Sequence, residues 1–234
     1  MTETDIANIA LGKIGGAGDQ ISGNAFLSSI DDTDKVSLWV NTQFPYVRQL
    51  VITDLAIAKC PFREATKFAD LGAALVAASA PEMGQWQYAF NLPGDYLSMV
   101  RQFNENYMQD RHLPEHERKF EVVPNKNTDG LVLLTNDLTN VVDAGSSDSA
   151  YIEYSFDLTN TGIWSTALVD CVATRLAAEA APIISKPDLR TPMLAEYDNF
   201  IVPQAQAFNR SQSNNNARKI HNYLGGRNTL LRQI

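Results

Sequence analysis

Three aspartates stand close together in the segment SSIDDTDKV, residues 28–36. Carboxylates grouped in this way can bind a divalent metal ion and support hydrolytic chemistry. An aspartate can also begin an α-helix, because its side chain accepts hydrogen bonds from unpaired backbone N–H groups. At a helix start, Asp31, Asp32 and Asp34 would point in different directions and would not converge on one ion. We therefore predict Asp31 and Asp32 as a helix N-cap.

A second group with metal-binding side chains is the pair His112 and His116. Two histidines four residues apart on a helix can bind one zinc ion. Pro114 lies between them and disfavours a helix at this place. A loop site that adds Glu115 and Glu117 is one interpretation, and an exposed polar loop is the other.

The sequence contains no complete motif of a phosphate-binding loop or of a hydrolytic nucleophile. The segment GGAG, residues 15–18, lacks the Gly-Lys-Ser/Thr ending of a P-loop. A P-loop also precedes a helix, whereas this segment follows a predicted one. No Gly-x-Ser-x-Gly elbow occurs, and neither Cys60 nor Cys171 has a histidine near it in sequence. We predict no catalytic residue, metal or cofactor, and we expect that the chain is not an enzyme.

The composition is that of an ordinary soluble globular protein, with 44% hydrophobic and 20% charged residues. A chain of 234 residues is expected to bury roughly 70% of its unfolded surface without a disulfide or a structural metal. Two cysteines far apart fit a protein made in a reducing cytoplasm. The opening MTETDIANIA does not resemble a secretion signal, and no stretch approaches the roughly 18 apolar residues of a membrane span. We expect no membrane partner.

The net charge of −8 is divided unevenly along the chain. No acidic residue follows Asp198. Residues 204–234 contain five basic residues, whereas residues 1–203 contain 14 basic and 27 acidic residues, a net charge of −13. Such a division indicates a basic arm that reaches for an acidic partner. A solvated, disordered tail is the alternative.

Helical periodicity recurs along much of the chain. The predicted helices cover residues 4–14, 31–59, 63–80, 165–184 and 186–210. Thr4 is predicted to cap the first helix, and Gly15 and Gly16 are predicted to end it. Pro45 is expected to bend the second helix, and Pro203 is expected to disturb the last one.

A short β section is predicted between the helices, because the period changes and turn residues appear. The predicted strands are residues 96–103, 119–124, 130–135 and 150–156. The charge-rich residues 104–118 are expected to form an exposed excursion, and residues 143–150 a small-residue loop. Asp157 or Thr159, together with Thr161, is expected to organise the entry into the next helix.

This order of elements predicts an α+β fold, a mainly helical bundle with a small inserted β section and an extended C-terminal arm. The bundle is expected to comprise residues 1–90 and 158–210. The β section is expected at residues 91–157, and the arm at residues 211–234.

Four stretches in this order resemble the head–tail adaptor proteins of short-tailed bacteriophages, the family that includes the tail tubular protein A of T7-like phages. They are DIANIALGKIGG followed by SSIDD, FPYVRQLVI, WQYAFNLPGDYLSMVR, and AYIEYSFDLTNTGIWSTALVDCVATRLAAEAAPII. The resemblance covers roughly residues 3–208. In the second stretch it implies that Tyr46 and Arg48 face the bundle.

The resemblance implies a structural virion protein without enzymatic activity. Proteins of this family form a ring of twelve copies beneath the portal vertex, help to retain the packaged genome, and present a platform for the tail nozzle. The expected partners are therefore the portal protein, a nozzle protein similar to tail tubular protein B, and further copies of the chain itself. DNA is expected to pass through the channel without sequence-specific binding. The expected location is the head–tail junction of the virion, after synthesis in the host cytoplasm.

The C-terminal segment of this family tends to reach the portal, so the basic arm is the candidate for that contact. The candidate portal-binding residues are Arg210, Arg218, Lys219, Tyr223, Arg227, Leu230, Leu231 and Arg232. Two other functions stay open from the residues themselves. One is weak, salt-dependent nucleic-acid binding through the basic arm. The other is a metal-dependent hydrolase that uses Asp31, Asp32, Asp34 and the loop of residues 112–117.

Overall fold

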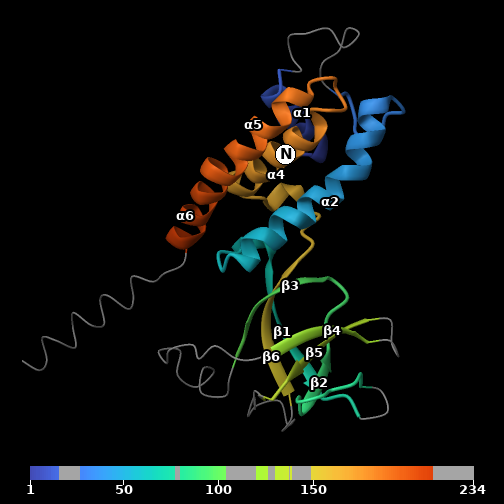
Figure 1. Ribbon diagram of the computed structural model, residues 1–234, viewed down its shortest axis with the longest axis vertical. Helices are drawn as coiled ribbons and strands as arrows, with labels where there is room; N and C mark the ends of the chain where they lie inside the picture. The colour runs from blue at the N-terminus through green and yellow to red at the C-terminus, as the bar shows by residue number, and fades with distance from the viewer. Residues whose placement is uncertain are drawn as a thin grey trace, which may run out of the picture.

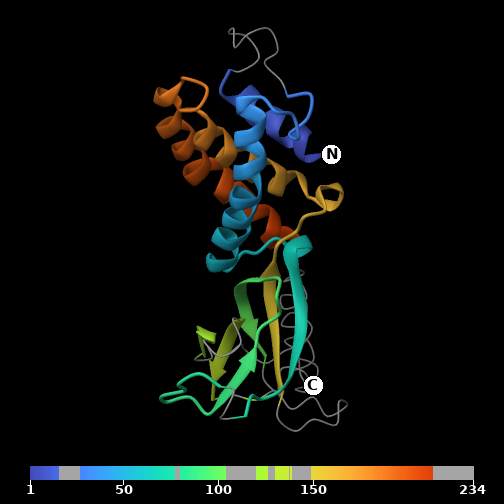
Figure 2. The ribbon, with the colours of Figure 1, turned by 90° about the vertical axis from the view of Figure 1, so that its right-hand side faces the viewer.

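The helices lie at one end of an elongated molecule and the strands at the other, as Figure 1 and Figure 2 show. The computed structural model describes residues 1–15, 27–76, 80–103, 120–125, 130–136, 138 and 149–212. The chain passes from the helical end to the strand end after residue 57 and returns after residue 156. Two connections therefore join the ends.

The helical end is built around α4. It contains α1 (Glu3–Lys13), α2 (Lys35–Ile57), α4 (Thr166–Ala180), α5 (Arg190–Glu196) and α6 (Val202–Gln212). Helix α4 contacts each of the other four helices. Alanines on α4, such as Ala173 and Ala177, are fully buried and allow close approach of its neighbours. The apolar stripe of α2, with Phe44, Val47 and Val51, completes the same core.

The strand end consists of two antiparallel, three-stranded sheets. Sheet A has the order β1 (Thr66–Ala73), β6 (Ser149–Phe156), β3 (Tyr96–Gln102), and sheet B has the order β2 (Tyr88–Asn91), β5 (Gly130–Thr135), β4 (Phe120–Asn125). Alternate residues of β6, including Ile152 and Tyr154, pack with Phe90 and Leu133 of sheet B. Because strand side chains alternate between faces, this pattern brings the two sheets together over a core of their own.

The expectation of a helix over residues 63–80 is wrong. Strand β1 occupies residues 66–73 and pairs with β6 in antiparallel register, beginning with Thr66 opposite Ser155. Alanine has the highest helix propensity, but propensity is a small effect, and pairing with the central strand β6 overrides it. Gly72 adopts a φ of 68°, in the left-handed region, where a helix could not continue.

The fold class therefore needs correction. The chain is α+β as predicted, but it is not a mainly helical bundle with a small β insertion. About half of the described residues are helical, and two three-stranded sheets form a separate end with its own core. The β section begins at residue 66, before the expected boundary at residue 91. The part of the expected arm that the structure describes, residues 211 and 212, belongs to α6.

The other predicted elements are confirmed with small shifts of their ends. The four predicted strands correspond to β3, β4, β5 and β6, and β2 is an additional strand. The predicted helices 4–14, 31–59 and 165–184 correspond to α1, α2 and α4. The excursion 104–118 lies outside the described residues, as does nearly all of the loop 143–150.

The last predicted helix, residues 186–210, is irregular. A 3₁₀ turn at Pro187–Leu189 precedes α5, and a π-helical segment, η4 (Tyr197–Ile201), separates α5 from α6. The Val202 N–H donates to the Tyr197 carbonyl, five residues earlier. Pro203 has no N–H for the next helical hydrogen bond, so the expected disturbance occurs one turn before it.

The helix caps differ from the predicted ones. Thr2, not Thr4, caps α1, in a reciprocal capping box with Asp5. Asp34, not Asp31 or Asp32, caps α2, because the helix begins at residue 35. The apolar pattern identified the helix correctly, but it did not fix which of three neighbouring aspartates comes first.

Replacing Asp34 with alanine is expected to lower the free energy of unfolding by about 1 kcal/mol. The Asp34 carboxylate accepts hydrogen bonds from the Val36 and Ser37 N–H groups and from the Ser37 hydroxyl. The bonds from Ser37 lower the pKa of Asp34. Urea denaturation at neutral pH measures the loss. Asp31→Ala is the matched control and should change stability by less than about 0.5 kcal/mol; equal losses in both variants would contradict the cap assignment.

Candidate interaction surface

The N-terminal half of α2 presents an uncharged face to solvent. Its exposed residues are Leu38, Asn41, Thr42, Pro45 and Tyr46. The last four follow Leu38 by three, four, seven and eight residues, which is close to whole turns, so all five share the side opposite the buried stripe. We call these five residues the α2 outer face. Leu38 is 53% exposed and Tyr46 is 60% exposed. Aromatic side chains are enriched at protein–protein interfaces, so an exposed tyrosine beside an exposed leucine makes this face a candidate contact surface.

The polar groups of the α2 outer face are partly used within the chain. The Thr42 hydroxyl donates to the Leu38 carbonyl one turn earlier, at 2.9 Å. The Asn41 amide donates to an Asp31 carboxylate oxygen at 3.5 Å. Pro45 has no backbone N–H to offer. Two of its polar side chains, those of Asn41 and Thr42, therefore have a partner within the chain.

None of the five residues of the α2 outer face is ionic, although the exposed Asp31 carboxylate lies beside Asn41 at its edge. Between Lys35 and Asp54, Arg48 is the single charged residue in the sequence. Arg48 is buried, with 4% of its surface exposed, and points away from this face. Depletion of charge is the compositional signal of the centre of a protein–protein interface.

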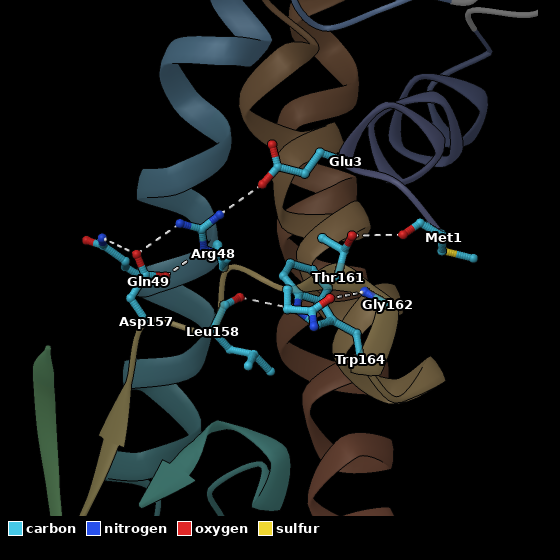
Figure 3. A network of polar contacts seen from close by, with 10 residues as sticks. Met1, Glu3, Arg48, Gln49, Asp157, Leu158, Thr161, Gly162 and Trp164 are labelled. Atoms are coloured by element: carbon cyan, nitrogen blue, oxygen red, sulfur yellow. Dashed lines mark hydrogen bonds and ion pairs between the residues drawn. The ribbon is translucent and has the colours of Figure 1, made fainter.

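Arg48 anchors α2 to the chain segment that leaves the sheets, as Figure 3 shows. Its guanidinium donates two hydrogen bonds to Asp157, at 2.6 and 2.9 Å, and one to Glu3 at 3.1 Å. Gln49 donates a further bond to Asp157 at 2.9 Å. The planar fork of an arginine matches a carboxylate in this two-bond geometry. The network therefore fixes α1, α2 and the end of β6 relative to one another.

Neighbouring contacts hold the segment between β6 and α4 in place. The Thr161 hydroxyl donates to the Met1 carbonyl, and the Trp164 indole N–H donates to the Leu158 carbonyl. The Trp164 ring stacks on Phe44 of α2, with ring centroids 6.1 Å apart. The α2 outer face is thus presented by a helix that is held on its other side by ionic, polar and aromatic contacts.

The pKa of Asp157 reflects this network. Burial acts to raise the pKa of this carboxyl, but the hydrogen bonds from Arg48 and Gln49 and the Arg48 charge outweigh burial, so the pKa lies below its ordinary value of 3.8. The folded state therefore binds fewer protons at this site than the unfolded state. The stabilisation is complete above the ordinary value and is lost as the pH falls through the lower, folded value.

At neutral pH the wild-type chain is expected to be more stable to unfolding than the variant Asp157→Asn, and this difference in stability is expected to disappear in acid. The amide keeps the shape of the side chain but cannot pair ionically with Arg48. Denaturation with urea between pH 7 and about pH 2 should show a difference in unfolding free energy that is largest at neutral pH and shrinks below about pH 4. A difference that stays constant over this range would contradict the assignment.

The three aspartates of residues 28–36 do not point at one position. Asp34 caps α2, Asp32 accepts hydrogen bonds from Ser28 and Ser29, and Asp31 lies beside Asn41. Within the described part of the chain, no group of three or more His, Cys, Asp or Glu side chains could hold a metal ion. The alternative histidine loop, residues 112–117, lies outside the described residues.

Of the candidate portal-binding residues, the structure describes Arg210, which is exposed near the end of α6. The others, Arg218, Lys219, Tyr223, Arg227, Leu230, Leu231 and Arg232, lie outside the described residues. Cys60 and Cys171 are both buried free thiols. Among the helices described, none combines the length and the apolar character that a membrane crossing requires.

The expectation for Tyr46 and Arg48 is half correct. Arg48 faces the bundle, but Tyr46 faces solvent. Sequence reasoning also missed the partnership of Arg48 with Asp157, which are 109 residues apart. The available signal was a lone charge in an otherwise uncharged helical stretch, which is typical of a buried, paired residue. Asp157 was expected to organise the entry into α4, whereas Ser165 caps that helix.

The chain matches no protein-family model and shows no significant similarity to a curated protein.

Proposed function

We propose that this chain is a structural protein of a bacteriophage virion. It forms a ring adaptor between the portal vertex and the tail nozzle, retains packaged DNA, and lets the DNA pass at ejection. The proposal combines the resemblance of four sequence stretches to head–tail adaptors with one structural observation. That observation is the α2 outer face, which is exposed, uncharged and rigidly supported.

An uncharged face is the surface at which identical acidic chains can meet. Residues 1–203 carry a net charge of −13, which opposes the approach of two copies. Contact through ionic carboxylates would add this repulsion to the cost of desolvation. The five residues of the α2 outer face bring no carboxylate of their own into such a contact. A partner with a strongly basic surface would instead be attracted to the acidic regions.

A ring would also give a role to the negative charge of residues 1–203, which we call the acidic body. Head-to-tail contacts between copies close into a ring when the rotation between neighbours is right. A channel wall of predominantly negative charge does not trap the phosphates of passing DNA. The basic arm would then lie at the periphery and bind the portal, repeated once in each copy, so that individually weak contacts combine.

Electron microscopy of the full chain mixed with the portal protein of the same virion tests the proposal. A ring of this chain stacked on the portal is the expected result. A second sample, the chain ending at Gln212, removes the arm after the last described residue of α6. It should still form rings at high concentration but bind the portal poorly. A full chain that stays monomeric beside the portal would contradict the proposal.

The charge division supports one alternative, a nucleic-acid-binding protein that uses residues 204–234. Five basic residues give weak binding that falls steeply with salt. A mobility-shift titration of duplex DNA at low and at physiological salt, with the full chain and with the chain ending at Gln212, separates the two functions. Binding that persists at physiological salt and requires the arm would favour the alternative.

A further inference from the structure

Strand β1 lies at an edge of sheet A, because among the described strands of that sheet it pairs only with β6. Its first five residues, 66–70, keep one continuous register with β6. In an antiparallel pair, alternate residues direct both backbone groups to the partner strand, and the residues between them direct theirs outward. Within the described part of the chain, no hydrogen bond is found for the outward backbone groups of residues 66–70. This edge can therefore accept a further strand.

The features that normally protect an edge strand from pairing are scarce in residues 66–70. Strand β3, the opposite edge of sheet A, has two register shifts, and strand β4 of sheet B contains Pro124. The register shift of β1 comes only after Asp70. Lys67 directs its ammonium to Asp95 at 2.7 Å. Asp70 thus remains as the charge that selects among incoming strands, and it favours a basic one.

One face of this edge carries an exposed aromatic ring beside an acidic side chain. Phe68 is 58% exposed, and its ring stacks on Tyr151 of β6 with the centroids 6.2 Å apart. The Phe103 ring lies 5.8 Å from that of Phe68. Asp70 shares this face, because strand residues two apart point to the same side. Its carboxylate accepts a hydrogen bond from the Gly72 N–H at 2.9 Å, and no basic group of the described residues pairs with it. The edge therefore presents an apolar side chain followed by an unneutralised carboxylate.

The end of α6 lies beside the segment that leads into β1. The Asn209 side-chain N–H donates to the Cys60 carbonyl at 2.9 Å, and both residues are buried. Cys60 precedes the first residue of β1 by six positions. The arm beyond α6, residues 213–234, therefore starts near this strand. It contains four basic and no acidic residues. Because it belongs to the same chain, its effective concentration at β1 is on the order of millimolar.

We propose that residues 230–234 of the arm add to β1 of their own chain as an antiparallel strand. Residues directly opposite each other in such a pair share a face of the sheet. Placing Arg232 opposite Asp70 brings Ile234 opposite Phe68, because the two strands run in opposite directions. The pairing matches a cation with the unneutralised carboxylate and an apolar side chain with the exposed ring. A register shifted by two residues in either direction loses the charge pair.

The arm is long enough for this arrangement. The ten residues from Cys60 to Asp70 span at most about 35 Å, and residues 213–226 can extend over about 45 Å. Gly225 and Gly226 then allow the chain to reverse, because glycine readily adopts turn conformations with positive φ. The contact lies within a single chain and does not depend on the proposed function. It covers an edge at which two chains could otherwise pair.

Disulfide trapping in the full chain tests the contact. Directly opposite residues of antiparallel strands have Cα atoms about 4.5–5.5 Å apart, which is within the range of a disulfide. The native Cys60 and Cys171 are buried, so they do not compete. We expect Asp70→Cys with Arg232→Cys to oxidise within one chain at least about tenfold faster than a matched control pair. The control is Asp70→Cys with Gln233→Cys, whose second thiol points to the other face of the sheet.

Amide hydrogen exchange provides the second measurement. In the wild-type chain, the outward N–H groups of residues 66–70 should exchange about threefold to tenfold more slowly than in Arg232→Asp, and the charge swap Asp70→Arg with Arg232→Asp should restore the protection. Equal exchange in the wild-type chain and in Arg232→Asp would overturn the proposal, as would equal oxidation rates of the two cysteine pairs. Disulfides that mainly join two chains would overturn the assignment to the chain's own arm.

Discussion

Replacing Arg48 with methionine is expected to lower the free energy of unfolding by about 3 kcal/mol. The methionine retains the apolar stem but leaves the Asp157 carboxylate without the two hydrogen bonds and the charge that compensate its burial. The side chain of Arg48 is 5% exposed and that of Asp157 is 22% exposed, so water replaces the lost partner only in part. Equilibrium denaturation with urea measures the loss.

The matched control is Arg190→Met, the same substitution at an exposed ion pair. The Arg190 side chain is 51% exposed and pairs with Glu179, so its loss should cost no more than about 1 kcal/mol. A double variant, Arg48→Met with Asp157→Leu, should recover part of the stability of the single variant, because no charge is left buried and unpaired. Equal losses of unfolding free energy in Arg48→Met and Arg190→Met would contradict a stabilising role of the Arg48–Asp157 network.

Replacing Tyr46 with glutamate is expected to weaken self-association of the chain about thirtyfold or more and to leave the fold of the single chain intact. Aromatic residues at the centre of an interface commonly contribute about 2 kcal/mol or more, and a carboxylate adds repulsion between chains of equal charge. Tyr46 is 60% exposed, so its own chain loses little packing. Sedimentation velocity over a range of concentrations measures the association, and thermal denaturation monitors the fold.

Phe200→Glu provides the control for this second prediction. Phe200 is 64% exposed on η4, so the substitution introduces the same charge at a residue of similar size and exposure on another element. Tyr46→Phe should retain association. Normal association of Tyr46→Glu would exclude the α2 outer face but would leave ring formation through another surface open. Equal losses from Tyr46→Glu and Phe200→Glu would indicate a general effect of charge.

The sequence alone determined the elements whose signals are local. Four strands and the helices α1, α2 and α4 follow from the period of their apolar residues, because burial on one face imposes that period. Pro203 likewise predicted an irregular last helix, because a missing N–H acts within one turn. The net charges of residues 1–203 and of residues 204–234 are properties of composition and need no structure.

Tertiary structure decided the features that depend on distant partners. Residues 66–73 form β1 because β6 supplies a pairing strand about 80 residues later in the chain, which local alanine content cannot reveal. That pairing adds the edge strand β1 to sheet A, which packs with sheet B over a separate core. Asp34 is the cap of α2 because the helix begins at Lys35, and the apolar period does not define a helix end to the residue.

The candidate surface shows the same division. The sequence shows that most of α2 is uncharged. It does not show which side of the helix faces the bundle, and we predicted that Tyr46 does. The structure separates the two sides, because Arg48 turns inward to meet Asp157, 109 residues away, and Tyr46 is left outside. Periodicity tells which residues share a side of a helix. Only the partners that pack against the helix decide which side remains for another molecule.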